Sequence, residues 1–155
     1  MWHRLKKQLA TERLQLNRLL ETHHAILAKC RTAEPTVDEV PALASILHSF
    51  YTGIENAFKR IAVEMDGGVP SGEFWHSELL ERMSSRASQR PAVISESLRL
   101  ALERYLDFRH VFRHAYSFEL KWSRMAPLVL ELETNLNRFE EELDRFLRAM
   151  EFREG

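Results

Sequence analysis

Apolar residues recur along much of the chain at spacings of three, four and seven, the spacing of positions on one face of an α-helix. The clearest pattern covers residues 37–65 and predicts a central core helix. Its apolar positions are Leu43, Ile46, Leu47, Phe50, Ile54, Ala57, Phe58 and Ile61. Residues 4–30 and the C-terminal part of the chain carry similar stripes. We therefore expect a long amphipathic helix near each end of the chain, packed against the other or against a neighbouring subunit.

Polar connections separate these patterns. The second helix can be capped by Thr36 or Asp38, and the glycines of residues 66–68 would stop it. A short helix is expected over residues 73–86, and Ser95 can cap a fourth helix. Five glycines and five prolines in 155 residues are few, as expected for helices joined by short connections.

The fourth helix is expected to end near Phe118, where its period is lost, and the last to begin at Ser123 or Pro127. No internal repeat or linker interrupts the chain. The sequence therefore predicts an all-α fold, an antiparallel bundle of about five helices that forms a single domain over residues 1–155.

Composition restricts the surroundings of the protein. The single cysteine, Cys30, cannot form an internal disulfide, which fits a reducing compartment, and it is expected in the core. No run of about 18 apolar residues is present, so no membrane span is expected. The basic N-terminus continues directly into an amphipathic helix and does not resemble a signal peptide. We expect a cytoplasmic protein.

The charge is unevenly distributed. The net charge is −1, but residues 82–124 carry an excess of Lys and Arg while the rest of the chain is acidic. This pattern fits either an anion-binding face or an uneven solvated surface. The sequence has no glycine-rich phosphate loop and no G-x-S-x-G motif, and nothing around Cys30 indicates a nucleophile. No cofactor is expected.

Chemically active residues concentrate between Arg109 and Tyr116, at the end of the fourth predicted helix. Arg109 and Tyr116 fall on the same helical stripe as the apolar residues Leu98, Leu102, Tyr105 and Phe112. A charge on an apolar face costs several kcal/mol, on the order of 3–5, unless it is paired or opens onto a cleft. This conflict between pattern and chemistry is typical of a functional site.

Two interpretations of this segment differ from metal-free catalysis: a metal site and a structural ion pair. Asp107, His110 and His114 are spaced i, i+3 and i+7 on one side of a helix and could bind zinc or iron. Alternatively, Arg109 could form an ion pair with Asp107 or Glu103, with Tyr116 as a half-buried aromatic residue.

A metal-free mechanism uses the same segment differently. RNA is cleaved when its 2′-hydroxyl loses a proton and attacks the neighbouring phosphate. His114 could take or give that proton, and Arg109 could stabilise the charge on the phosphate. Positive potential would come from Arg113, His110 and Lys121. On a straight helix Arg109 and His114 point about 140° apart, so either the helix bends or a second copy completes the site.

The pattern Arg109-x4-His114-x-Tyr116 resembles the R-x4-H-x-Y motif of HEPN-domain ribonucleases, specifically the HepT-like toxins. The resemblance extends to residues 43–55, to the turn at 67–72 with the following Trp75-His76, and to residues 108–122.

This resemblance implies an all-α, homodimeric, metal-independent endoribonuclease that acts on RNA. Arg109 and His114 would be the catalytic pair in a cleft between subunits, supported by Asp107, His110 and Arg113. Tyr116 would be the residue to which a partner nucleotidyltransferase antitoxin of the MNT type attaches AMP. The alternative is a non-catalytic helical module that binds nucleotides or proteins, with the motif as a dimer interface.

Overall fold

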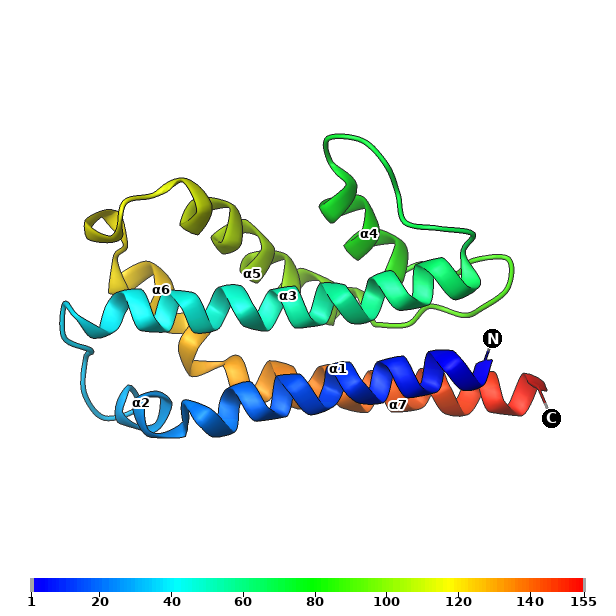
Figure 1. Ribbon diagram of the computed structural model, residues 1–155, viewed down its shortest axis with the longest axis horizontal. Coiled ribbons are helices and arrows are strands. Elements are labelled where there is room, and N and C mark those ends of the chain that lie inside the picture. Colours follow the sequence, from blue (N-terminus) through cyan, green and yellow to red (C-terminus); the bar gives the residue numbers. More distant parts are fainter. Residues whose placement is uncertain (1, 155) are drawn as a thin grey trace.

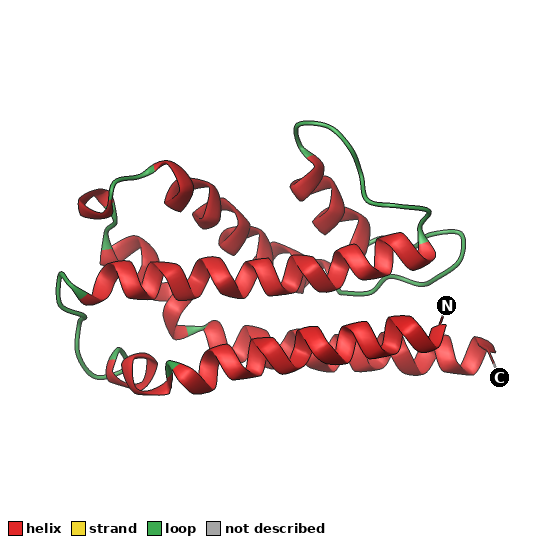
Figure 2. Cartoon of the chain, in the orientation of Figure 1, coloured by secondary structure: helices red, strands yellow, loops and turns green. Residues whose placement is uncertain are grey.

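A computed structural model describes residues 2–154, and all of its regular elements are helices (Figure 2). They are α1 (Trp2–Thr22), α2 (His24–Lys29), α3 (Glu39–Met65), α4 (Trp75–Met83), α5 (Glu96–His114), the 3₁₀-helix η1 (Ser117–Glu119), α6 (Trp122–Leu130) and α7 (Leu132–Glu154). The all-α prediction is confirmed, although the chain divides into more helices than the expected five.

The extra helices arise from two breaks in predicted continuous segments. The first predicted helix is interrupted at His23, whose backbone (φ −105°, ψ 20°) leaves the helical region. The last predicted helix is interrupted at Glu131 (φ −98°, ψ 4°), one turn after Pro127. The fourth helix ends at His114 and not near Phe118, because Ala115 adopts extended backbone (φ −98°, ψ 143°). The breaks at His23 and Glu131 fall at neither a glycine nor a proline, the usual sequence signals of a break.

Helix α3 is the centre of the structure (Figure 1). It contacts α1 on one side and α4, α5 and α6 elsewhere on its surface, while α7 packs against α1 and α5. Neighbouring long helices run antiparallel, and the beginning of α1 lies close to the end of α7, where Lys6 pairs with Glu151 (Figure 1). The buried side chains, including Cys30, form one hydrophobic cluster. The expectation that the two terminal amphipathic helices pack against each other is therefore confirmed within one chain.

Local hydrogen bonds fix where the helices begin. At the start of α3 the amide of Glu39 donates to Thr36 Oγ1 (3.3 Å), and the amide of Thr36 donates to Glu39 Oε1 (2.9 Å). This reciprocal arrangement is a capping box, so Thr36 and not Asp38 provides the cap. The predicted cap of α5 is confirmed, because Ser95 Oγ accepts from the amide of Leu98 (3.1 Å).

A buried ion pair holds α4 in place. Arg90 follows α4, and its Nε and Nη2 donate to the two carboxylate oxygens of Asp66 at the end of α3 (2.8 and 2.7 Å). The Arg90 side chain has no exposed surface, and its Nη1 also donates to the carbonyls of Ser85 and Pro91. Such a bidentate pair has strict geometry. It ties the two ends of the segment that contains α4 to each other.

Candidate active site

Arg109 points into the bundle and forms an ion pair with α3. Its Nη2 donates to both carboxylate oxygens of Glu55, at 3.2 and 3.0 Å, and both side chains are almost completely buried. The guanidinium lies 5.0 Å from the centre of the Tyr51 ring. The charge on the apolar stripe of α5 is thus compensated by a charge on the apolar stripe of α3.

His76, from α4, completes this cluster. Its Nδ1 lies 2.7 Å from Glu55 Oε2 and 2.9 Å from Arg109 Nη2. A protonated Nδ1 would donate to Glu55, whereas an unprotonated Nδ1 would accept from Arg109, so the state of the ring decides which bond forms. Glu55 and Arg109, both buried, and the half-buried His76 therefore form a polar cluster that joins α3, α4 and α5.

Tyr51 lies beneath the cluster and stays neutral. Burial, reinforced by the nearby Glu55 carboxylate, raises the pKa of Tyr51 far above its ordinary value of 10. Tyr51 therefore contributes a ring face to Arg109 and carries no charge into the site.

The partners that the sequence suggested for Arg109 are wrong. Glu103 pairs instead with Arg99 (3.3 Å), one turn away on the same helix, and Asp107 is exposed. The idea that Arg109 is paired is correct, but its partner comes from a segment 54 residues away in the sequence. Local spacing on α5 could not reveal it.

The other motif residues are exposed near the end of α5. His110, Arg113 and His114 all face solvent, and the rings of His110 and His114 meet edge to face with centroids 4.8 Å apart. No hydrogen bond joins Arg109 to His114 among the described residues, as their divergence on a straight helix leads one to expect. Cationic side chains at this position also complement the negative end of the helix dipole.

Tyr116 does not continue the α5 stripe. It lies beyond the end of the helix and is 71% exposed, so the expectation of a half-buried aromatic residue is wrong. Its ring stacks on that of Phe118 with centroids 5.5 Å apart. The amide of Tyr116 donates to Glu119 Oε1 (2.9 Å), which fixes the turn. The Tyr116 side chain is therefore presented largely to solvent in this turn.

The structure does not assemble Asp107, His110 and His114 into a metal-ligand set. Within residues 2–154, no group of three or more His, Cys, Asp or Glu side chains is arranged to hold a metal ion.

His48 of α3 is a further polar residue near the motif. Its ring packs on Phe112 (centroids 5.4 Å apart), and its buried Nδ1 has no hydrogen-bond partner among the described residues. Burial, with a smaller effect of Arg109 and Arg113, lowers the pKa of His48 below its ordinary value. His48 is therefore a neutral imidazole beside two arginines near neutral pH.

Sequence reasoning missed the roles of Glu55 and His76. One signal could have identified Glu55, because it shares a helical face with Tyr51 and Phe58 and so places an acid among buried positions. Two isolated opposite charges on separate apolar stripes are natural partners. His76 has no such signal, since it lies at the start of a short helix.

The site therefore belongs to an all-helical protein with an R-x4-H-x-Y motif at the end of one helix. A family model described as HepT-like protein matches residues 42–150, which include the motif, Glu55 and His76. The chain belongs to the HepT-like family, which connects it with HEPN-type toxins and, at a coarse level, with HEPN ribonucleases. Comparison with curated proteins and with solved structures gave no match. None of the helices within residues 2–154 has the length and apolar character that a membrane crossing requires.

Proposed function

We propose that this protein is a metal-independent endoribonuclease, the toxin of a HEPN/MNT toxin–antitoxin pair, with Arg109 and His114 as its catalytic pair. The observation that supports this function best is the arrangement of the motif in a HepT-like chain. The exposed His114 lies at the end of α5, while Arg109 is held by Glu55 and His76 from two other helices.

In the proposed reaction the 2′-oxygen of a ribose loses its proton and forms a bond to the adjacent phosphorus. The bond from phosphorus to the 5′-oxygen breaks, and that oxygen takes up a proton. His114 carries one of these protons, since a histidine can take or give a proton near neutral pH. The products are a 2′,3′-cyclic phosphate and a 5′-hydroxyl. Among the supporting residues, His110 contacts the His114 ring, and Arg113 adds positive charge. Asp107, a turn before His110, can orient the His110 ring.

Arg109 stabilises the negative charge that develops on the phosphate. Its Nη2 is occupied by Glu55 and His76, whereas its Nη1 makes only a long contact of 3.5 Å with Thr52 Oγ1. Nη1 is therefore the nitrogen left for the substrate, and Glu55 and His76 are positioning residues. Because the Arg109 side chain is only 5% exposed, phosphate binding requires a shift of α4 or of the arginine itself.

A second copy of the chain completes the site in this proposal. Arg109 and His114 of one chain point about 140° apart on α5, so an Arg109 and a His114 from different chains can approach one phosphate more easily. Val111 and Phe118 are large apolar side chains exposed in the motif segment and just after it. Exposed apolar side chains grouped in this way suit a two-fold interface.

The antitoxin in this proposal silences the enzyme through Tyr116. A nucleotidyltransferase of the MNT type joins the tyrosine oxygen to the α-phosphorus of ATP, and pyrophosphate leaves. The exposure of Tyr116 supports such a modification. The attached AMP brings bulk and negative charge next to Arg113 and His114, which hinders RNA binding.

The burial of Arg109 favours a second candidate function. A guanidinium that is buried and paired with Glu55 can be purely structural, since buried ion-pair networks occur away from active sites. The protein would then be a non-catalytic helical module that binds nucleotides or proteins.

Incubation of purified, unmodified protein with RNA in EDTA distinguishes the two functions. The wild type should cleave. His114→Ala should lose roughly 10²–10⁴-fold in rate. Arg109→Lys should also fail, because an ammonium cannot replace the planar fork. His24→Ala, at an exposed histidine on α2, is the matched control and should cleave normally. A folded wild type that leaves RNA intact would support the binding module, and cleavage only after a divalent metal is added would contradict the metal-free mechanism.

A further inference from the structure

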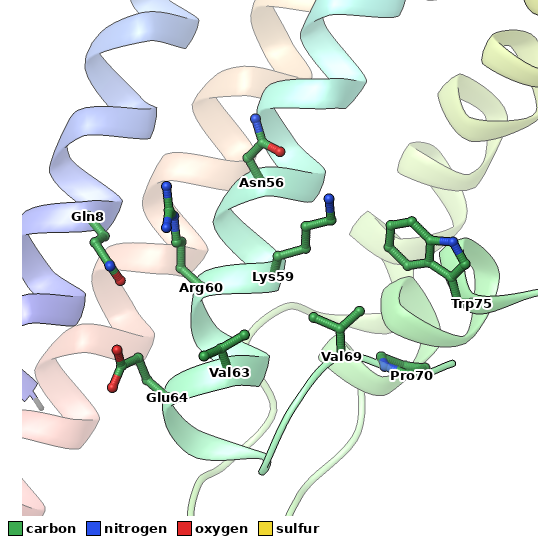
Figure 3. Close-up of a pocket in the computed structure, with 9 residues that line it drawn as sticks. All are labelled: Gln8, Asn56, Lys59, Arg60, Val63, Glu64, Val69, Pro70 and Trp75. Carbon is green, nitrogen blue, oxygen red and sulfur yellow. The ribbon is translucent and has the colours of Figure 1, made fainter. Parts of the chain in front are cut away.

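A pocket of about 610 Å³ opens on α3, between α1 and the start of α4 (Figure 3). Its volume is in the range of small-molecule binding sites. The side chains that decide its chemistry are Asn56, Lys59 and Arg60 of α3 and Trp75 of α4. None of them belongs to the R-x4-H-x-Y motif.

Trp75 offers an aromatic surface in this pocket. Its ring packs on His76, with centroids 3.7 Å apart, and the Lys59 ammonium lies 5.0 Å from the centre of the ring. Figure 3 shows Lys59 extending toward Trp75 across the pocket. A half-buried indole beside an ammonium is the combination that recognises a nucleotide, with a base stacked on the ring and a phosphate on the cation.

The cations of the pocket are only weakly neutralised. No acidic side chain forms an ion pair with Lys59 among the described residues, and Arg60 reaches Glu12 only at 4.0 Å. The acid at the pocket edge, Glu64, is already paired with Arg4 at 2.7 Å. The pocket therefore retains positive potential for a phosphate.

The pocket is connected to the candidate active site through α3. Asn56 follows Glu55 in the sequence, and it also lines a second hollow that includes Thr52 and His48. Thr52 is the residue that Arg109 Nη1 contacts. Thr52 and Lys59 are separated by about 10 Å along the helix. A short stretch of RNA could therefore reach both the pocket and Arg109.

We propose that this pocket binds one nucleotide of the RNA strand, with its base against Trp75 and its phosphate held by Lys59 and Arg60. This inference rests on the proposed function, because it assigns a binding subsite to the same substrate. On binding, the flexible Lys59 side chain leaves the ring face to the base and moves to the phosphate. Only an unpaired base can stack in this way, so the substrate segment at the pocket is single-stranded.

Binding of a labelled single-stranded oligoribonucleotide, measured by fluorescence anisotropy in EDTA, tests the inference. All variants carry His114→Ala so that the strand is not cut. Trp75→Leu removes the stacking surface and should weaken binding about tenfold, whereas Trp75→Phe should retain most of the affinity. Recovery with phenylalanine separates loss of stacking from loss of packing, and urea unfolding of each variant checks the fold.

The salt dependence tests the phosphate contact independently. Lys59→Gln should reduce the slope of log affinity against log salt by about 0.7, the value for one phosphate contact on a single strand. Arg148→Gln is the control, because it removes an equal charge from an exposed position on α7, outside the pocket. Its slope should equal that of the parent.

Two results would overturn the inference. One is unchanged affinity in Trp75→Leu together with an unchanged salt slope in Lys59→Gln. The other is that the pocket variants change self-association, measured by sedimentation, but do not change RNA binding. That result would assign the pocket to a second copy of the chain. Cleavage by the wild type is scored separately. A protein that cleaves but whose pocket variants bind normally refutes only the pocket, whereas a protein that does not cleave refutes only the enzyme.

Discussion

Glu55→Gln is the most informative single substitution, because it removes the charge that compensates buried Arg109 while keeping the shape of the side chain. The carboxylate lies 3.0–3.2 Å from Arg109 Nη2 and 2.7 Å from His76 Nδ1. Both members of the ion pair are about 5% exposed, so water cannot replace the lost partner. Breaking such a buried pair costs about 3–5 kcal/mol. Because the glutamine amide oxygen can still accept one hydrogen bond, we expect the lower part of this range.

A loss of about 3 kcal/mol is a large fraction of the 5–15 kcal/mol that stabilises a typical domain. Urea unfolding followed by circular dichroism should therefore show a clear fall in the midpoint without a change in slope. The matched control is Glu103→Gln, at the acid of α5 that local spacing suggested as the partner of Arg109. Within residues 2–154, Glu103 pairs with Arg99 alone, at the surface, so the unfolding midpoint of Glu103→Gln should hardly differ from that of the wild type.

A double substitution isolates the interaction. Glu55→Leu with Arg109→Met replaces both charges by apolar groups and should be more stable than either single variant, since neither charge is left buried alone. Two results would refute the assignment of Glu55 as the charge partner of Arg109. One is an equal urea midpoint for Glu55→Gln and Glu103→Gln. The other is a double variant whose loss of stability equals the sum of the losses of Glu55→Leu and Arg109→Met.

Two further predictions concern pH and modification. The lowered pKa of His48 means that the unfolded chain, with its ordinary pKa of 6.5, takes up the proton first as the pH falls. The stabilising contribution of neutral His48 is therefore complete above pH 6.5 and is lost as the pH falls toward the pKa of His48 in the folded protein. His48→Gln should flatten the pH dependence of the urea midpoint over this range. A pH profile equal to that of the wild type would contradict the lowered pKa of His48. Tyr116→Phe should keep its RNA-cleaving activity but gain no AMP mass when incubated with the transferase and ATP. A modified Tyr116→Phe protein would show that AMP is attached elsewhere.

Helical periodicity predicted the fold well because each long helix buries one continuous apolar stripe. The stripe of α3 was identified correctly, and every residue assigned to it is buried. The breaks at His23 and Glu131 were missed, since neither position carries glycine or proline. These breaks change the direction of the chain without changing which side chains are apolar, so a hydrophobic pattern does not record them.

The candidate site was predictable only where it is local in sequence. The motif on α5 could be found by spacing, and the burial of Arg109 followed from its position on an apolar stripe. Its pairing with Glu55 and His76 depends on how three helices meet, which no spacing within one helix contains. The end of α5 at His114 was also missed, so Tyr116 was placed on a helical face when it belongs to an exposed turn.

The Asp66–Arg90 pair has a consequence for how this fold can vary. In polymer terms it is a crosslink at the base of a loop, and the loop contains all of α4. Lengthening such a loop costs only about 0.6 kcal/mol for each doubling. Residues can therefore be inserted near Ser71 and Gly72, both exposed, without disturbing the register of the long helices. The loop around Ser71 and Gly72 can thus vary in length in evolution while α4, with Trp75 and His76, keeps its place in the bundle.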